Sequence, residues 1–204
     1  MRATFMQRLL AYLVDIVVIS VVVSIFTFSF DNSKLEEINT ELNTAMNDLM
    51  TATTGGSEAS ELNMDEINQK ITDLEYDYQK ATVLQNSISV VIYILYFIAF
   101  QFLYKGQTVG KKLLKLRVVT KEEKEPSLTT FVVRGIIIEG ILATFLSLIA
   151  IVLLSKDTYL TIYTWLSMLS STFIVASALM VLYRKDRRGL HDMMAKTIVI
   201  KEEK

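Results

Sequence analysis

Two carboxylates stand inside apolar stretches, where an acidic side chain is costly and therefore informative. Asp15 is the only charged residue of the apolar run 9–30, and Glu139 lies inside the apolar run 131–154. A carboxylate at bilayer depth costs about 3 kcal/mol on insertion scales, so such a residue is a candidate functional site. Its chemistry would be proton or cation binding, or hydrogen bonding that locks helices together. Both interpretations of Asp15 stay open at this point.

Two arginines are placed to pair with these acids. Arg8 precedes Asp15 by seven residues and therefore points from the same helix face. Arg134 stands near the same end of its run as Arg8 does, and Asp15 and Glu139 are about equally deep in their runs. Because buried charges in membranes are tolerated when paired, we expect Arg8, Asp15, Arg134 and Glu139 to form one intramembrane polar cluster, which Asp192 reaches from the membrane edge.

Four elements must position this cluster. The apolar runs 9–30, 87–104, 131–154 and 160–183 are each long enough to cross a bilayer core of roughly 30 Å as a helix. The first run is too long for a cleaved signal peptide, contains Asp15 and lacks a small-residue cleavage site after it. The predicted fold is an all-α membrane protein with four transmembrane helices, divided into 1–30 (first helix), 31–84 (outer segment), 85–104 (second helix), 105–130 (basic loop), 131–154 (third helix), 155–183 (short turn and fourth helix) and 184–204 (tail).

The charges are partitioned along the chain. Residues 31–84 hold twelve acids and three bases, whereas 105–134 hold eight bases and 184–204 hold seven. Basic residues accumulate in cytoplasmic segments. We therefore expect both termini and the basic loop in the cytoplasm of a bacterial cell, the acidic segment outside, and a multi-pass protein of the cytoplasmic membrane.

The acidic outer segment carries helical periodicity. Apolar residues recur at three- and four-residue steps on both sides of the turn-forming residues 53–57. The set before the turn is Leu35, Ile38, Leu42, Ala45 and Leu49, and the set after it is Ile67, Ile71, Leu74, Tyr78 and Ala81. This spacing predicts an extracytoplasmic helical hairpin; the alternative is a solvated acidic loop. On the inner side, the β-branched runs 116–120 and 197–201 predict a small cytoplasmic β-ribbon that packs on the helices.

The composition excludes several kinds of chemistry. The chain has no cysteine, which excludes disulfides, Fe–S clusters and thiol catalysis. His191 is the only histidine, and no nucleophile is identifiable beside it, so we expect no catalytic residues, no metal site and no cofactor. The basic segments are explained by membrane topology and anionic lipid, and we expect contact with the lipid bilayer but not with nucleic acid.

Three motifs resemble those of the RDD family of small bacterial membrane proteins, which is named for one arginine and two aspartates. They are residues 8–15 (RLLAYLVD), 106–119 (GQTVGKKLLKLRVV) and 188–199 (RGLHDMMAKTIV). On this match the naming residues are Arg8, Asp15 and Asp192. The chain departs from the family pattern at Val109, where proline is usual, and at Lys196, where glycine is common. Its long outer segment departs more, because family members often have a short first loop.

The resemblance adds a cytoplasmic motif to the candidate site: Gly106, Thr108, Gly110, Lys111, Arg188, His191 and Asp192. We expect Asp192 to accept hydrogen bonds from residues 106–112 and so to clamp the tail to the basic loop; the alternative is a solvated aspartate that caps a turn. Charge-assisted bonds of this kind are about twice as strong as neutral ones.

Two functions remain open from the sequence, and neither is enzymatic. The first is an adaptor or regulator that binds another membrane or extracytoplasmic protein through residues 31–84. The second, implied for some members by the family resemblance, is exchange of a monovalent cation for a proton through Asp15 and Glu139. Four spans are few for an ion pathway, so the second function requires a homo-oligomer.

Overall fold

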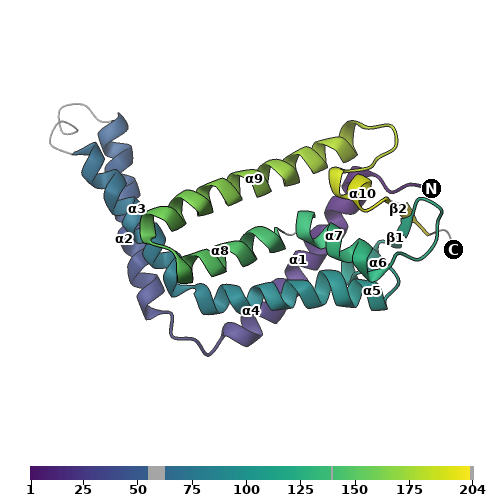
Figure 1. Ribbon diagram of the computed structural model, residues 1–204, viewed down its shortest axis with the longest axis horizontal. Coiled ribbons are helices and arrows are strands. Elements are labelled where there is room, and N and C mark those ends of the chain that lie inside the picture. The colour runs from purple at the N-terminus through teal and green to yellow at the C-terminus, as the bar shows by residue number, and fades with distance from the viewer. Residues whose placement is uncertain (55–62, 139, 203–204) are drawn as a thin grey trace.

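Long helices dominate the computed structural model, which describes residues 1–54, 63–138 and 140–202. Helix α1 (Phe5–Thr27), the continuous helical segment Val83–Leu103 and helix α9 (Lys156–Tyr183) are long and apolar enough to cross a membrane. Their exposed side chains are mostly apolar, as lipid-facing helix surfaces must be. In Figure 1 the helices of the core run side by side along the length of the molecule. The prediction of an all-α multi-pass membrane protein is confirmed.

The third predicted span is broken, which corrects the expectation of one continuous helix over 131–154. Helix α7 (Leu128–Ile138) and helix α8 (Ile141–Leu153) meet at 65°, and only the two together are long enough to form a fourth span. Gly140 precedes α8 with a left-handed backbone (φ +60°). Glycine adopts this conformation without the steric penalty of a side chain, and it ends a regular helix.

The second span is continuous but not uniform. Helix α4 (Val83–Ile94) passes into the π-helix η2 (Leu95–Phe100) and then into α5 (Gln101–Leu103). A π-helical turn widens the helix locally and is common at functional positions. Tyr96 lies in this widened turn.

The acidic outer segment forms two helices that pack against each other, α2 (Ser33–Thr54) and α3 (Met64–Ala81). Ile38, Ala45 and Leu74 are buried between them or at their base. In Figure 1 this pair projects from one end of the molecule. The predicted turn over 53–57 falls mostly on residues 55–57, outside the described part of the chain. The extracytoplasmic location of the pair stays a prediction.

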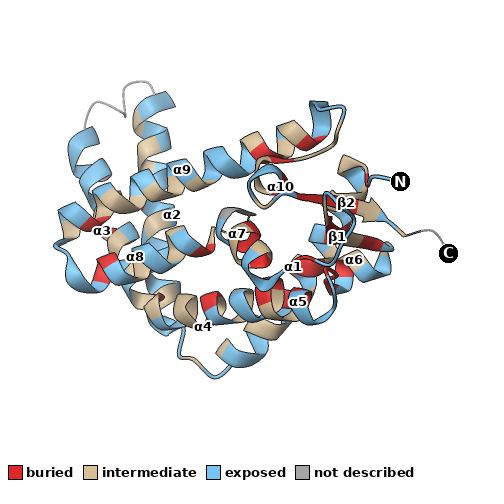
Figure 2. Cartoon of the chain, turned by 45° about the vertical axis from the view of Figure 1, so that its right-hand side comes forward, coloured by how far each residue is buried: buried red, intermediate tan, exposed pale blue. Residues whose placement is uncertain are grey.

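The small ribbon is confirmed with its predicted bounds. Strands β1 (Leu116–Thr120) and β2 (Thr197–Lys201) pair antiparallel, with Leu116 opposite Lys201. Leu116, Val118 and Val199 belong to one buried cluster with residues of α1, α4, α7 and α8, so the ribbon packs on the helices. Figure 2 shows that buried residues gather where β1, β2, α6 (Val109–Leu113), α7 and α10 (Leu190–Met194) meet, whereas α2 and α3 are mostly exposed.

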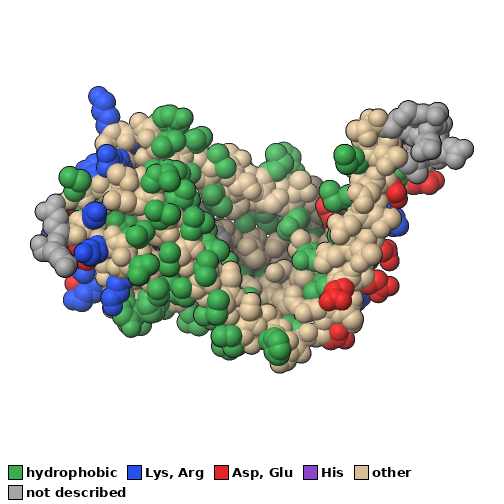
Figure 3. Space-filling view, turned by 180° about the vertical axis from the view of Figure 1, so that it is seen from behind, with side chains coloured by type: hydrophobic (Ala, Val, Ile, Leu, Met, Phe, Trp, Pro, Cys, Tyr) green, Lys and Arg blue, Asp and Glu red, His purple; other side chains and the backbone are tan. Residues whose placement is uncertain are grey.

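The two ends of the molecule differ in charge. Figure 3 shows Lys and Arg side chains gathered at the ribbon end and Asp and Glu side chains on the projecting helices, with apolar side chains between them. This distribution follows the partition of charge along the sequence. The buried carboxylates of the candidate site lie in the core at the basic end.

Candidate functional site

Asp15 is held in a cage of hydrogen-bond donors between α1, η2 and α6. Its carboxylate accepts bonds from the Tyr96 hydroxyl (2.6 Å), the Thr108 hydroxyl (2.6 Å) and the Gly110 N–H (2.7 Å). The Val109 N–H in turn donates to the Tyr96 oxygen at 3.1 Å. Asp15 is 1 % exposed. Three donors within 2.7 Å satisfy a buried carboxylate that would otherwise be strongly unfavourable.

The spacing of the central motif follows from this cage. Gly106 makes the turn into the motif with a left-handed backbone, and its carbonyl accepts a bond from Val118 N–H in β1. Thr108 caps the start of α6, because its hydroxyl accepts a hydrogen bond from the Lys111 N–H. The same hydroxyl donates to Asp15. Gly110 contacts α1 so closely that a Cβ atom there would lie 2.0 Å from the Ala11 carbonyl oxygen. The motif therefore docks α6 and the ribbon onto the first span.

Asp192 forms a second buried cluster with two arginines. Arg8 Nη1 lies 2.5 Å from Asp192 Oδ2, and Arg134 Nη1 pairs with Asp192 Oδ1. Arg134 also donates to the Thr197 hydroxyl at the start of β2. Asp192 is fully buried and Arg134 is 4 % exposed. Burial opposes ionisation, but Arg134, His191 and Arg8 together hold the pKa of Asp192 well below its usual 3.8. This carboxylate joins α1, α7, α10 and β2.

His191 completes the second cluster. Its Nε2 lies 3.3 Å from Asp192 Oδ1, and its Nδ1 is in hydrogen-bond contact with the Ser177 hydroxyl of α9. Burial lowers the pKa of His191 below 6.5, against the opposing effect of Asp192. A neutral imidazole that carries its proton on Nε2 donates to Asp192 and accepts from Ser177, which satisfies both nitrogens. His191 thereby ties α10 to the fourth span.

The structure divides the predicted four-residue cluster. Arg8 and Arg134 bond to Asp192, whereas the hydrogen bonds of Asp15 run to Tyr96, Thr108 and Gly110. The prediction that Asp192 accepts bonds from residues 106–112 is therefore wrong, because Asp15 takes those bonds instead. Glu139 lies outside the described residues.

Two further residues of the predicted motif stand at the margin of the site. The Arg188 guanidinium lies 3.9 Å from Asp186, near the surface turn that precedes α10. Lys111 Nζ lies 3.4 Å from the Thr108 hydroxyl, and Lys111 lines a cavity between α1 and α9.

Sequence reasoning missed three participants, Tyr96, Ser177 and Thr197. Each is a hydroxyl in an apolar or β-branched setting: Tyr96 donates to Asp15, Ser177 contacts the His191 ring, and Thr197 accepts from Arg134 and donates to Asp192. A buried tyrosine hydroxyl usually has a partner, so the position of Tyr96 within a predicted span was a usable signal. Thr197 carried no such signal, because threonine is ordinary in a strand.

The family comparison agrees with this geometry. The model of the RDD family matches residues 2–196, which is nearly the whole chain and includes the first two motifs and most of the third. The chain belongs to the RDD family. It matches no curated protein and no solved structure at a significant level. In this RDD protein Arg8 pairs with Asp192, and Asp15 docks the central motif.

The Asp15 and Asp192 carboxylates are both occupied by protein groups, and this determines what the site can do. Asp15 accepts three hydrogen bonds and Asp192 pairs with two guanidinium groups. Among the residues that the structure describes, no group of three His, Asp or Glu side chains could hold a metal ion. The arrangement is suited to joining the termini, the central loop and the spans into one unit.

The lowered pKa of His191, whose side chain is 13 % exposed, predicts a pH-dependent stability. Because its folded pKa is lowered, the unfolded chain binds the proton more readily as the pH falls below about 6.5. The free energy of unfolding should then fall by up to about 1.4 kcal/mol for each pH unit in that window. Since His191 is the only histidine, unfolding curves of the purified protein between about pH 7.5 and 5 should report this group. His191→Gln should remove the slope; an equal slope in the variant would assign it to other groups.

Asp192 contributes only at lower pH, since its stabilisation is lost as the pH falls below 3.8.

Proposed function

We propose that this RDD-family protein is a membrane adaptor or regulator that binds another membrane or surface protein through the α2–α3 hairpin. The observation that carries the proposal is the internal use of the two family carboxylates. A carrier carboxylate must exchange its proton for a cation during each cycle. Asp15 and Asp192 instead hold α6, α10 and the strands in place, which leaves the projecting hairpin as the surface available for a partner.

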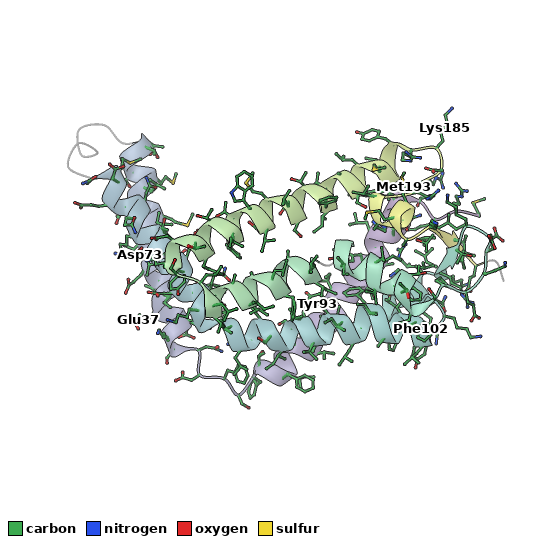
Figure 4. All side chains as sticks on the ribbon, viewed as in Figure 1. Glu37, Asp73, Tyr93, Phe102, Lys185 and Met193 are labelled. Atoms are coloured by element: carbon green, nitrogen blue, oxygen red, sulfur yellow. The ribbon has the colours of Figure 1, made fainter. Side chains whose placement is uncertain are left out.

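The base of the hairpin is fixed to the core, as a presenting module requires. The rings of Tyr76 and Tyr159 are in edge contact at 5.7 Å, and Tyr159 is 1 % exposed. Gln79 Nε2 donates to the Tyr163 hydroxyl at 2.9 Å. Lys156, at the start of α9, pairs with Asp73 of α3, and Figure 4 shows Asp73 at this junction. A rigid mount reduces the entropy lost when a partner binds.

The far part of α2 carries an exposed apolar pair on an otherwise polar surface. Met46 and Met50 are 59 % and 65 % exposed and stand one helical turn apart. Methionine side chains are flexible and polarisable, and they are common on surfaces that bind partners. Asp and Glu side chains lie along the projecting helices (Figure 3). These features support a protein partner with an apolar contact surrounded by basic groups.

The charge asymmetry supports an orientation. The ribbon end is basic and the hairpin end is acidic (Figure 3). By the positive-inside rule the ribbon, both termini and the buried clusters face the cytoplasm, and the hairpin faces outward. The partner would then be a membrane or surface protein on the outer side.

Site-specific photocrosslinking in cells tests the adaptor proposal. A photoreactive residue that replaces Met46 or Met50 should give one discrete adduct. A photoreactive residue at a third hairpin position should give the same adduct, and the double variant Met46→Glu/Met50→Glu should prevent that adduct from forming. Glu37 (Figure 4) is the matched control, since it stands on the opposite side of the helix from Met46 at 100° per residue. Equal adducts from Glu37 and Met46, or adducts insensitive to the double variant, would contradict a specific surface.

Ion exchange makes the opposite prediction for Asp15. Under the adaptor proposal, vesicles that contain the purified protein show no proton flux that requires Na⁺ or K⁺ and is also lost when Asp15 is replaced. Such a flux, lost in an Asp15→Asn protein that remains folded, would overturn the proposal and restore the carboxylate as a carrier.

A further inference from the structure

A cavity of about 410 Å³ lies between α8 and α9 and extends from the base of the hairpin to the break at Gly140. Helix α3 of the hairpin contributes Tyr78 and Gln79 to its lining, and α9 contributes Ser170, which stands at the middle of the fourth span. In Figure 1, α8 and α9 run side by side from the hairpin toward this break. The cavity therefore reaches from the hairpin end of the molecule into its membrane-spanning part.

The lining of this cavity is polar but uncharged. Nine of the thirteen described residues that line it carry a hydroxyl or carboxamide group, and none of the thirteen carries a formal charge. Hydrogen-bonding groups at bilayer depth need partners, because hydrocarbon offers them none. The content of the cavity must therefore be polar.

The hydroxyl groups of the lining do not join the two helices to each other. Hydroxyl side chains often link transmembrane helices by hydrogen bonds. Here the hydroxyls of Thr144, Ser147 and Ser167 donate to carbonyl oxygens three or four residues earlier in the chain. Among the residues that the structure describes, no hydrogen bond connects a lining side chain of α8 with one of α9. The hydroxyl oxygens keep lone pairs that can accept bonds from a ligand.

The carboxamide and phenol groups add both kinds of hydrogen-bonding partner. The Tyr163 hydroxyl accepts a bond from Gln79 Nε2, which leaves its own proton to donate. Asn86 Nδ2 donates to the Thr82 hydroxyl, which leaves the Asn86 carboxamide oxygen as an acceptor. A lining that both donates and accepts matches a ligand whose groups also do both, as hydroxyl groups do. An ion would find no counter-charge among these lining residues, which is unfavourable at this depth.

We propose that this cavity between α3, α8 and α9 binds an uncharged polyhydroxyl group of the size of a monosaccharide. At roughly 30 Å³ per water molecule, its volume equals that of about fourteen waters, enough for one sugar ring with water around it. Ser171 and Ile174 of the lining are exposed on α9, so the cavity is open toward the bilayer as well as toward the hairpin. The sugar group is therefore either a free sugar or the headgroup of a glycolipid. This site goes beyond the adaptor role, since it does not include Met46 or Met50.

Single-cysteine variants test the cavity directly, because the chain has no cysteine of its own. Ser170→Cys lies in the lining, and Thr172→Cys, exposed about 200° further around the same helix, is the matched control. The full chain is placed in phosphatidylcholine nanodiscs prepared without sugar-based detergent. The uncharged reagent iodoacetamide should alkylate the Ser170→Cys protein faster than the control, because a thiol in contact with lipid stays protonated and unreactive.

Glucose is the first probe of the site. About 0.1 M glucose should slow alkylation of the Ser170→Cys protein about tenfold, as a dissociation constant near 10 mM gives through the factor 1 + [L]/Kd, and should not affect the control. Gluconate and glucosamine have a similar size but carry a charge, so they should protect much less. Equal alkylation of the two cysteine variants, or equal protection by glucose and gluconate, would overturn the site.

A glycolipid distinguishes the two sources of the sugar group. Protection by glucosyl diacylglycerol in the nanodisc, without protection by free glucose, assigns a lipid headgroup; protection by glucose assigns a free sugar. No protection by either probe would overturn the proposal. Added to Ser170→Cys, Ala143→Phe fills the cavity and should abolish protection, whereas Leu142→Phe, exposed outside the lining, should retain it. Protection that survives Ala143→Phe would place the sugar elsewhere and contradict the site.

Discussion

Asp192→Asn should lower the free energy of unfolding by about 3–5 kcal/mol, because it leaves Arg8 and Arg134 buried without a counter-charge. Asparagine retains the size of the side chain but can no longer compensate two guanidinium groups. Chemical unfolding in mixed detergent micelles measures the loss. The C-terminal strand should also become accessible to protease, since Asp192 and Arg134 together hold Thr197.

Asp186→Asn is the matched control for this prediction. Asp186 forms ion pairs with Arg184 and Arg188 at the protein surface, with longer distances of 2.9 and 3.9 Å. Exposed pairs contribute at most about 1 kcal/mol, so the control should unfold close to the parent protein. Adding Arg134→Met to Asp192→Asn should recover part of the lost stability, because it removes one of the uncompensated charges. Similar losses at Asp186 and Asp192, or no recovery, would contradict the paired cluster.

Gly110→Ala should destabilise the protein by about 3 kcal/mol or more, at or beyond the upper end of the usual range for overpacking. The added methyl group would lie 2.0 Å from the backbone oxygen of Ala11 and 3.0 Å from Asp15 Oδ1. A backbone carbonyl within a helix cannot move aside, so α6 must separate from α1 and release the bonds of Asp15. A lower melting temperature and reduced accumulation in the membrane measure this effect.

Gly135→Ala is the control for the glycine prediction. There the nearest atoms to the added methyl group belong to the flexible side chain of Ile98, at 3.1 and 3.3 Å. Alanine also favours the helical state over glycine by about 1 kcal/mol, which offsets a small rearrangement of Ile98. We expect a melting temperature near that of the parent. Tolerance of alanine at Gly110, with the α1–α6 contact retained, would show that this close approach is not needed.

The spans and the ribbon followed from local patterns in the sequence. Apolar length gave the spans, and the two β-branched runs gave β1 and β2 with their observed bounds. The break at Gly140 was not predicted, because an isolated glycine in an apolar run is compatible with a continuous helix.

The partners of the charged residues could not be derived in the same way. Counting along each span gave the depth of Asp15 and Arg134, but depth does not determine which neighbouring helix a side chain faces. The Asp15 carboxylate turns toward η2 and α6, and Arg134 turns toward α10. The sequence therefore identified residues of both clusters and brought Asp192 to the two arginines, but it placed Asp15 with the arginines and assigned the hydrogen bonds of residues 106–112 to Asp192. The family motifs supplied the residues but not the pairing.

The Arg8–Asp192 pair has a consequence for biosynthesis, because it joins residues 184 positions apart. During translation the first helix enters the membrane while its arginine still lacks a counter-ion, and Arg134 reaches the same condition later. Both charges are neutralised only when the last segment, with Asp192 and β2, leaves the ribosome and docks. A product truncated before Asp192 retains every hydrophobic helix yet leaves two unpaired cations at the core. Such a chain lacks the carboxylate that joins α1, α7, α10 and β2 in the complete fold.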